Sequence, residues 1–516
     1  MTLPLALLLS ALSGLVALSS ELVWYRTWSF AAQGTASAFG ALLGFYLLGL
    51  AGGSYAGGRL CGERDVAALG RVVRGIALAV LAASLLGFLV TPAFALASRL
   101  GLHSAALPVV ALTTTLMGAV FPLVSHAGVP PDERVGPRVS YLQGANIAGS
   151  ATGSLVTGFV LMDVWTLRTI ATAVALAGLA LSLGVFLIAR PSRRELGRGA
   201  ALVAAAAVAV VGLGPSLYRD AYEKMQRGPA YDPAHPFAHI VETRSGVITV
   251  TDDGEVYGGG AYDGVFRVDL RDDRNGIYRA FALGAFAPAP RRVLMIGLAS
   301  GSWARVIAAF PTVERLTIVE INPGYLELMK LYSGGEALLA NPKVQIVIDD
   351  GRRWLQRHPR ESFDLVVQNT TWHWRAHITD LLSREYLELV RTHLAAGGVI
   401  NFNTTFSPNA QKTAVTVYPY ALRVRNFVAV SDAPLTFDED RWRAFLVPFR
   451  LEGRPLFDAA SPSDRALLEQ VLALAGNVDH GDPTNGLETR AHLLARLAAT
   501  EIVTDDNMRV EWHDAW

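Results

Sequence analysis

The chain has 516 residues, 51% of them hydrophobic, and a mean hydropathy of +0.32. It is too long and too apolar for one soluble domain, and the apolar excess lies almost wholly before Pro215. The 45 basic residues balance 45 acidic ones without a basic block, so nucleic acid is not an expected partner. The single cysteine, Cys61, excludes an internal disulfide framework and a cysteine-based zinc site, and no metal ligand is predicted.

Seven apolar stretches in residues 1–216 are long enough to cross a bilayer, which takes about 20 residues. Glycine and alanine are abundant in them, as in membrane helices that pack closely, and such faces also permit a homo-oligomer. The first residues lack a positive segment and a cleavage-like site, so residues 2–20 are predicted to be a retained span. We therefore predict a multi-pass protein of the cell membrane. The stretches lie near residues 3–20, 35–53, 72–97, 103–127, 141–162, 168–190 and 199–216.

Polar residues within apolar spans are costly and therefore informative. Glu21 and Arg26 lie near a predicted span end beside tryptophans, which favours an interfacial anchor with a local ion pair. Gln143 and Asn146 are expected to form hydrogen bonds across helices, and Asp163 is a further polar candidate. A transport path through these residues stays open as an alternative.

The arginines between the stretches indicate an orientation for the spans. They are concentrated in the even-numbered loops, which are therefore predicted to be cytoplasmic. Seven spans would then put the C-terminal part outside the cell. The short alanine-rich stretch 199–216 is the first candidate for a segment that does not span, and the side stays open.

Four segments are predicted from composition: a transmembrane domain at 1–216, a linker at 217–237, a small β region at 238–290 and a Rossmann-like domain at 291–516. Further strands are expected within 414–430 and 443–450. Amphipathic helices are expected at 466–475 and 488–499, with packing as their role.

The stretch 291–322 is typical of a nucleotide-binding βαβ unit. An apolar run at 293–296 stops at Gly297, Gly301 precedes a helical pattern, and a second strand at 316–321 carries Glu320 near its end. Glycines allow backbone N–H groups to approach a ligand, and an acid about 20 positions later accepts ribose hydroxyls.

Two more apolar runs extend this pattern. Residues 344–348 are followed by Asp349, Asp350 and Gly351, where a carboxylate at a strand end suits an adenine amino group. Residues 363–367 are followed by Gln368 and Asn369. No lysine–serine pair follows the glycines, so a triphosphate loop is not expected.

Residues 239–403 resemble the spermidine synthase (polyamine aminopropyltransferase) type of class I S-adenosylmethionine fold. The pieces that carry the resemblance are DDGEVY at 252–257, Tyr278, VLMIGLASG at 293–301, IVEIN at 318–322, DDGRRWL at 349–355, FDLVVQN at 363–369 and LLSREYLELVRTHLAAGGVINFN at 381–403. The first half also resembles the membrane part of multi-pass spermidine synthase-like proteins, through SSELVWYRTW at 19–28, LMGAVFPLV at 116–124 and YLQGANIAGSATGSLVTGF at 141–159, and the ending TDDNMRVEW at 504–512 is similar too.

The resemblance implies a polytopic helical membrane domain followed by a Rossmann-like α/β domain with a small N-terminal β region. It implies no prosthetic group, with S-adenosylmethionine or its decarboxylated form as a small-molecule substrate. In this family an amine attacks the aminopropyl arm and 5′-methylthioadenosine leaves.

The sequence departs from the family at the acceptor site. The family's Asp-Ser-Ser-Asp run corresponds to residues 369–372, which here read Asn-Thr-Thr-Trp, so both acids are missing. An uncharged Asn369 cannot deprotonate an ammonium. Ser300 replaces an acid and Arg279 replaces a histidine, an exchange that suits a substrate retaining its carboxylate.

The leading interpretation is therefore cleavage of the sulfonium on the aminopropyl side by ring closure within the substrate, a step that needs mainly positioning. His373 and His377 either supply a base or belong to a lid at 372–377, whereas Asp364 and Asp380 are expected to be structural. A methyltransferase acting on a hydrophobic substrate, and a transporter or sensor whose nucleotide domain only binds, remain alternatives. The candidate catalytic residues are Asn369, His373 and Tyr278, and the candidate substrate-binding residues are Gly297, Ser300, Gly301, Glu320, Asp350, Gly351, Arg279 and Tyr257.

Overall fold

The computed structural model describes residues 1–516 except 63–65, 288, 370–371, 474–485, 508–509 and 514–516. Two compact units divide the chain. The first comprises Met1–Pro236 together with Glu242–Gly246, and the second comprises Phe237–Val241 and Val247–Trp516. Each unit is described by itself below.

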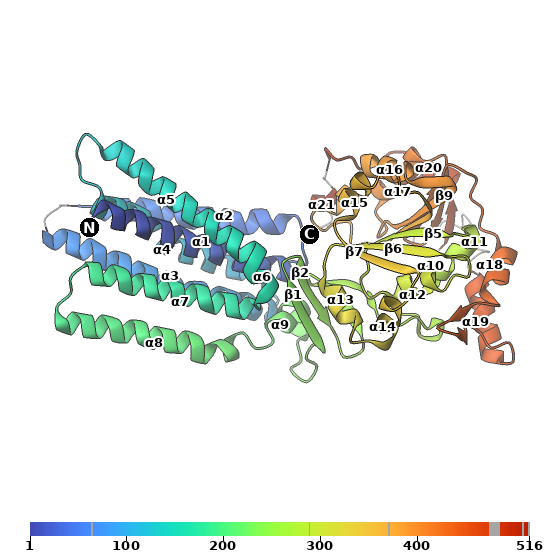
Figure 1. The fold of residues 1–516 in the computed structure, drawn as a ribbon, viewed down its shortest axis with the longest axis horizontal. Helices are drawn as coiled ribbons and strands as arrows, with labels where there is room; N and C mark the ends of the chain where they lie inside the picture. Colours follow the sequence, from blue (N-terminus) through green and yellow to red (C-terminus); the bar gives the residue numbers. More distant parts are fainter. Residues whose placement is uncertain (63–65, 288, 370–371, 474–485, 508–509, 514–516) are drawn as a thin grey trace. The chain divides into compact units, whose positions relative to one another are not determined.

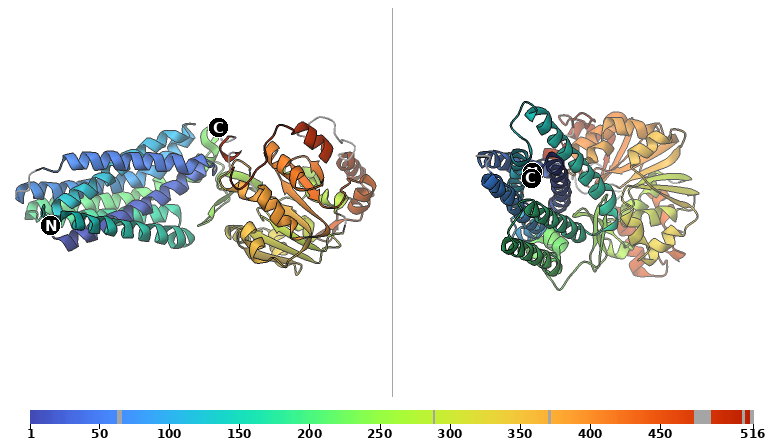
Figure 2. Two further views of the ribbon diagram at one scale, coloured as in Figure 1. Left: turned by 90° about the horizontal axis from the view of Figure 1, so that it is seen from above. Right: turned by 60° about the vertical axis from the view of Figure 1, so that its left-hand side comes forward.

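The first unit is a bundle of helices, of which seven in the described part of the chain are long and apolar enough to cross a membrane (Figures 1 and 2). This agrees with the seven predicted stretches, although the helices run several residues past most of them. A π-helical turn at Thr157–Leu161 and the short α6 (Met162–Val164) extend the fifth one. The long helices are α1 (Leu3–Ala31), α2 (Ser37–Arg59), α3 (Val66–Arg99), α4 (Leu107–Gly128), α5 (Val135–Val156), α7 (Leu167–Ile188) and α8 (Arg193–Leu217).

Glycines let two pairs of helices, α1 with α5 and α2 with α4, approach at backbone distance. A Cβ atom added to Gly149 of α5 would lie 1.8 Å from the carbonyl oxygen of Ala11, and one added to Gly53 of α2 would lie 1.9 Å from that of Thr115. Small residues are what such close helix contacts require.

The contacts expected of the polar residues in the bundle are confirmed only in part. The predicted ion pair between Glu21 and Arg26 is wrong for the described residues, because Arg26 donates instead to the Thr243 carbonyl of the same unit. Asn146 confirms the expected bond across helices, since its Nδ2 donates to the Ser10 carbonyl oxygen at 3.0 Å. Gln143 makes no side-chain hydrogen bond within the described part of the chain.

The stretch predicted as a linker, residues 217–237, contains a short helix, α9 (Ala221–Arg227). Its Tyr222 and Met225 are buried, and α9 packs on α3 and α1. Phe30 of α1 makes an edge-on contact with the Tyr222 ring, with centroids 4.8 Å apart. This stretch is therefore attached to the first unit by side-chain packing.

A four-stranded sheet, in the order β1-β2-β3-β4, follows. Its strands are β1 (His239–Thr243), β2 (Gly246–Val250), β3 (Glu255–Gly258) and β4 (Ala261–Val265). All four lie within 238–290, the stretch where a small β region was predicted.

The core of the second unit is a mixed eight-stranded sheet in the order β14-β10-β11-β9-β8-β5-β6-β7. The strands from β9 to β7 are parallel, and β11, β10 and β14 are antiparallel additions. The strands are β5 (Arg292–Ile296), β6 (Arg315–Glu320), β7 (Val344–Ile348), β8 (Phe363–Gln368), β9 (Leu394–Asn403), β10 (Tyr420–Val424), β11 (Phe427–Ser431) and β14 (Leu487–Thr489). This confirms the predicted Rossmann-like fold.

Side chains alternate between the two faces of this sheet, as the twofold repeat of a strand requires. Val293 and Met295 of β5 join one core cluster, whereas Leu294 and Ile296 join the other. The first face is covered by α10 (Tyr278–Phe281), α11 (Leu283–Phe286), α12 (Ser302–Ala308), α13 (Gly324–Met329), α14 (Ser333–Leu339), α18 (Glu439–Leu446) and α19 (Pro462–Leu472). The second is covered by α15 (Gly351–Arg357), α16 (Arg384–Arg391), α17 (Pro408–Val417) and α20 (Arg490–Arg496) (Figure 1).

Two expectations near the C-terminus need correction. The segment 443–450 was expected to be a strand, but its first part is helix α18, because Asp438 caps that helix and Trp442 and Leu446 are buried one turn apart. The helix expected at 488–499 begins only at Arg490, since Glu488 belongs to β14. Residues 474 and 475 of the other expected helix lie outside the described residues.

We expect Gly149→Val to destabilise the first unit, because the new side chain would overlap the α1 backbone. Overpacking of this kind costs about 1–3 kcal/mol. Gly144→Val on the same helix is the matched control, since no atom lies within 4 Å of a Cβ added there. Thermal unfolding in detergent should show a lower midpoint for Gly149→Val alone. Equal midpoints for the two variants would contradict the close packing of α1 on α5.

Candidate functional site

The turn between β5 and α12 lies at the carboxyl end of the central strand. Gly297, Ala299 and Gly301 all have positive φ, at 86°, 47° and 71°. A Cβ atom on Gly297 would lie 3.2 Å from the Asn369 carbonyl oxygen, so a side chain there would be strained and crowded. The turn thus brings the end of β5 against the residue that follows β8.

Glu320, at the end of β6, holds this turn in place. Its Oε2 accepts the Leu298 N–H at 2.7 Å, and its Oε1 accepts the Asn322 N–H at 2.7 Å. The side chain is buried, and burial raises the pKa of the Glu320 carboxyl to about 7. A carboxylate so placed can accept the hydroxyls of a ribose that lies over the turn.

A second acid, Asp263 of β4, lies near Glu320. The Tyr325 hydroxyl donates to Asp263, and burial raises the pKa of the Asp263 carboxyl. Arg375 opposes this effect electrostatically, and its guanidinium lies close to Gly259 at the start of the β3–β4 turn. The small β sheet therefore contributes a carboxyl group to the site, which sequence reasoning missed.

Asp350 and Gly351 continue the site along the next strand end. Asp350 caps α15 by accepting the Arg353 N–H at 2.7 Å through Oδ1. A Cβ atom on Gly351 would lie 2.7 Å from the Ile296 side chain, so only glycine allows this helix to start so close to β5. Asp349 instead forms ion pairs with Arg353 and Arg357.

A chain of amide side chains connects Asn369 to Arg279. Asn403 Nδ2 donates to Asn369 Oδ1 at 3.3 Å, and Asn426 Nδ2 donates to Asn403 Oδ1 at 2.8 Å. Arg279 Nη1 donates in turn to Asn426 Oδ1. These contacts contain no carboxylate, so the position that follows β8 has a neutral hydrogen-bonded environment.

Arg279 is held by neutral acceptors only. Its Nε donates to the Gly276 carbonyl at 2.7 Å, its Nη2 donates to the Asn275 carbonyl, and the guanidinium lies 5.1 Å from the Phe427 ring centroid. Burial lowers the pKa of Arg279 to about 10. It makes no ion pair within the described residues, and the Asp273 carboxyl, which accepts the Tyr278 N–H, acts on it electrostatically without direct contact.

Ser300 lies near Asn275, the residue whose backbone carbonyl accepts from Arg279. Its Oγ would be 3.0 Å from a Cβ atom on Gly264, and the Asn275 amide nitrogen would be 3.5 Å from that atom. Tyr262 donates to Asn275 Oδ1 at 3.1 Å, and the Tyr257 ring contacts Tyr262 edge-on. Tyr257 is therefore connected to Arg279 through Tyr262 and Asn275, whereas the Ser300 hydroxyl forms a hydrogen bond with that of Ser302 at 3.0 Å.

His373 joins the amide network from the loop after β8. Its Nδ1 lies 2.6 Å from Thr405 Oγ1, and the Thr405 N–H donates to Asn403 Oδ1 at 2.8 Å. Residues 370 and 371 of the loop lie outside the described residues. The Tyr278 backbone N–H donates to Asp273 at 3.0 Å, and its phenol acts on Arg279 electrostatically, but its hydroxyl forms no hydrogen bond among the described residues.

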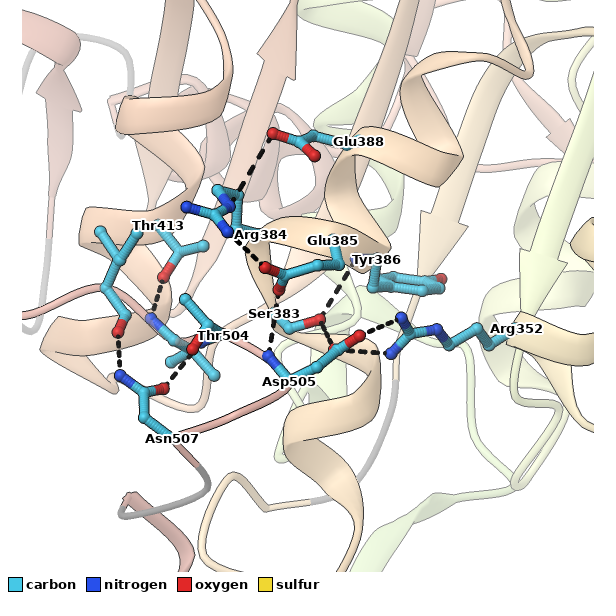
Figure 3. Close-up of polar contacts among 12 residues, drawn as sticks. Arg352, Ser383, Arg384, Glu385, Tyr386, Glu388, Thr413, Thr504, Asp505 and Asn507 are labelled. Atoms are coloured by element: carbon cyan, nitrogen blue, oxygen red, sulfur yellow. Dashed lines mark hydrogen bonds and ion pairs between the residues drawn. The ribbon is translucent and has the colours of Figure 1, made fainter.

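The C-terminal segment fixes the helices around the site. Asp505 pairs with Arg352 of α15 through both oxygens, at 2.8 and 2.5 Å, and accepts the Ser383 hydroxyl at 2.6 Å (Figure 3). Glu511 accepts the backbone N–H groups of His377 and Thr379 at 3.0 and 2.9 Å. The end of the chain therefore anchors both α15 and the loop that carries His373.

Asp364 has the structural role expected of it. Its Oδ2 accepts the backbone N–H groups of Arg291 and Arg292, both at 2.8 Å, at the start of β5. This contact aligns β5 with β8 at the edge opposite the candidate site.

Comparison with known proteins gives the family. Residues 282–425 match the family described as "Spermine/spermidine synthase domain". This part of the chain is similar to spermine/spermidine synthase domains. The predicted resemblance is confirmed, and the prediction of a transferase agrees with the names of the homologues.

Two relatives are polyamine aminopropyltransferases. That of Mycobacterium tuberculosis is 29% identical over 310 residues, which is 56% of each chain. Polyamine aminopropyltransferase 2 of Streptomyces coelicolor is 28% identical over 277 residues, 51% of this chain and 48% of the relative. The chain thus spans about half the length of these relatives. The solved spermidine synthase of Thermotoga maritima is 17% identical, with 46% of this chain and 88% of that chain covered and a TM-score of 0.35.

Sequence reasoning missed the residues that connect the matched part of the chain to elements distant in the sequence. Asn403 ends β9, Asn426 lies in the β10–β11 turn, and Glu511 lies in the last helix, α21 (Val510–His513). None of them belongs to a spaced motif around the glycine turn. Asn403 and Glu511 lie in the stretches 381–403 and 504–512, which carried the family resemblance but gave these two residues no role.

We expect the binding of 5′-methylthioadenosine to weaken about tenfold between pH 8 and pH 6. With a pKa of about 7, the Glu320 carboxyl is mostly ionised at pH 8 and mostly protonated at pH 6, and only the ionised group accepts from both ribose hydroxyls. Titration calorimetry at the two pH values measures the effect.

Glu320→Gln should bind weakly and without this pH dependence. Glu327→Gln is the matched control, because Glu327 is exposed and pairs with Lys330 on α13. Equal affinity of the wild type at pH 6 and pH 8 would show that the Glu320 carboxyl does not hold the ribose.

Proposed function

We propose that this chain is a membrane-integrated, spermidine synthase-like enzyme that acts on S-adenosylmethionine and releases 5′-methylthioadenosine by cleavage on the aminopropyl side. The seven apolar helices support the membrane location. The glycine turn, Glu320 and Asp350 support the binding of an adenosyl group: Glu320 takes the ribose, and the second oxygen of Asp350 takes the adenine amino group.

Arg279 supports a substrate that keeps its carboxylate. A buried guanidinium without an ionic partner is unfavourable, and a ligand carboxylate near Asn275 and Ser300 would neutralise it. Three of its five N–H groups already donate within the protein, so Nη1 and Nη2 retain one N–H each for a ligand. The decarboxylated substrate would leave this charge buried and unpaired.

The neutral contacts of Asn369 are the observation that carries the proposal. Transfer to an amine needs a group that removes a proton from an ammonium, and Asn369, Asn403 and Asn426 cannot do so. Asp263 is the nearby acid, but it accepts from Tyr325 and faces the positive charge of Arg375. A nucleophile that carries no proton suits this environment.

The carboxylate of the substrate is such a nucleophile. One of its oxygens forms a bond to the γ-carbon, the bond between that carbon and sulfur breaks, and the electron pair stays on sulfur. The products are neutral 5′-methylthioadenosine and a five-membered α-amino-γ-butyrolactone. No proton is transferred, so the protein needs only to hold the methionine arm in the geometry that allows ring closure.

The loop after β8 would exclude water during this step. Trp372 and Trp374 stack with ring centroids 6.1 Å apart, and Glu511 holds the following backbone at His377 and Thr379. Lower access of water favours ring closure over hydrolysis. His373, bonded to Thr405, then has a positioning role in this loop.

We expect purified protein in detergent to form 5′-methylthioadenosine from S-adenosylmethionine without any added amine. The decarboxylated form should give none under the same conditions, because it lacks the attacking carboxylate. Mass spectrometry of both incubations, with and without polyamines, provides the measurement.

Three other outcomes would contradict the proposal. A product that appears only with a polyamine would indicate an acceptor site. S-adenosylhomocysteine would indicate methyl transfer to a hydrophobic substrate. Retained binding of both compounds without turnover would indicate a transporter or sensor.

Arg279→Met should weaken S-adenosylmethionine binding by roughly 10- to 100-fold, since a hydrogen bond between charged groups contributes about 1.5–3 kcal/mol. Binding of the decarboxylated form should be unchanged or tighter, so the preference between the two compounds is the readout. Arg274→Met is the matched control, because Arg274 is an exposed neighbour that pairs with Asp272 and Asp253. Tighter binding of the decarboxylated form by the wild type would overturn the role of Arg279.

A further inference from the structure

The helical unit encloses a cavity of about 260 Å³. It lies among α1, α2, α3, α4, α5 and α7, and it reaches the surface of the unit at Ser54 and Gln143, which are exposed. An engineered cavity of 150 Å³ binds benzene, so this one has room for a larger organic molecule. The residues that line it are Ser13, Val16, Tyr46, Ser84, Phe121, Asn146 and neighbours on the same helices.

One face of α5 supplies the hydrogen-bonding groups of this cavity. Gln143, Asn146 and Ser150 are spaced by three and four residues, so they lie on one side of the helix. Asn146 uses its amide nitrogen to bind α1, which leaves its oxygen available. The Gln143 carboxamide makes no hydrogen bond within the described chain and offers both a donor and an acceptor.

Tyr46 on α2 is a second, independent sign of a ligand. Its side chain is only 3% exposed and lines the cavity, yet its hydroxyl has no hydrogen-bond partner among the described residues. Leaving a buried hydroxyl unpaired costs free energy, and native proteins seldom do so. By contrast, the lining hydroxyls of Ser13, Ser54 and Ser84 donate to backbone carbonyls.

The lining also restricts the charge of the ligand. The described residues that form the cavity include no Asp, Glu, Lys, Arg or His, and most of the lining is apolar. An ammonium or carboxylate placed there would have no counter-charge in direct contact, since Glu21, which acts on Tyr46 electrostatically, is not part of the lining. A polyamine or an amino acid therefore does not fit, whereas an uncharged molecule with an apolar body does.

We propose that this cavity binds a small uncharged amphiphilic molecule, with its hydroxyl, ketone or carboxamide group against Gln143 and Tyr46 and its apolar body toward Val16, Val80 and Phe121. The inference is independent of the reaction in the second unit, because it rests on the helical unit alone and its test measures binding only.

The test compares three probes with the same phenyl body: 2-phenylethanol, 2-phenylethylammonium and phenylacetate. Saturation-transfer NMR is recorded on the full chain in lipid nanodiscs, with empty nanodiscs as background. We expect saturable binding of 2-phenylethanol, and binding of the two ions at least tenfold weaker.

Gln143→Met should weaken 2-phenylethanol binding roughly fivefold to tenfold, as expected for the loss of neutral hydrogen bonds. Tyr46→Phe should weaken it less. Thr152→Val is the matched control on α5, because Thr152 is exposed, donates to the Ala148 carbonyl and lies outside the cavity. Absence of saturable binding, tighter binding of either ion, or an equal effect of Thr152→Val would overturn the proposal.

Discussion

A largely buried positive charge that makes no ion pair in the described chain is the constraint on which the candidate site depends. Arg279 is desolvated, and the groups that contact it are two carbonyls, an asparagine oxygen and an aromatic ring. Such a group is stable only if its hydrogen bonds are good and a counter-charge arrives with the ligand. The same charge accounts for the neutral side chains of Asn426, Asn403 and Asn369. An acid at one of these positions would form an ion pair with Arg279, which would then no longer attract a substrate carboxylate.

Contacts to the backbone hold the strand ends and helix starts around the site in fixed positions. Glu320 joins the ends of β5 and β6, and Gly351 starts a helix directly against Ile296. The C-terminal segment then holds α15 through Asp505 and the following loop through Glu511. Residues on rigid strand ends and capped helices keep their positions better than residues on free loops.

The parts of the fold that could be read from the sequence are those governed by local pattern. The strands β5 to β8 are short apolar runs that end at glycine, acidic or amide residues, and each was expected close to where it lies. The strand expected at 443–450 was wrong because its apolar run belongs to a helix, and the evidence for this was the cap at Asp438. Pattern also could not separate β14 from α20, because a strand of three residues is too short to show a period of its own.

The candidate site was only partly accessible to the same reasoning. Gly297, Glu320 and Asp350 follow a known spacing, but Asp263, Asn426 and Glu511 reach the site through tertiary packing that no local pattern encodes. Likewise, the ion pair expected between neighbouring Glu21 and Arg26 is absent from the described chain because a distant backbone carbonyl takes its place. Long-range partners decide the chemistry of buried charges, and a single sequence does not reveal them.

The origin of the γ-oxygen in the product tests the central claim most directly. S-adenosylmethionine labelled with ¹⁸O in its carboxylate is converted, the lactone is opened in unlabelled water, and the resulting homoserine is fragmented in a mass spectrometer. Ring opening breaks the bond between the carbonyl carbon and the ring oxygen, so our account predicts that the γ-hydroxyl carries ¹⁸O. A γ-hydroxyl with oxygen from the solvent would show that water attacks the arm, and would contradict displacement by the substrate's own carboxylate.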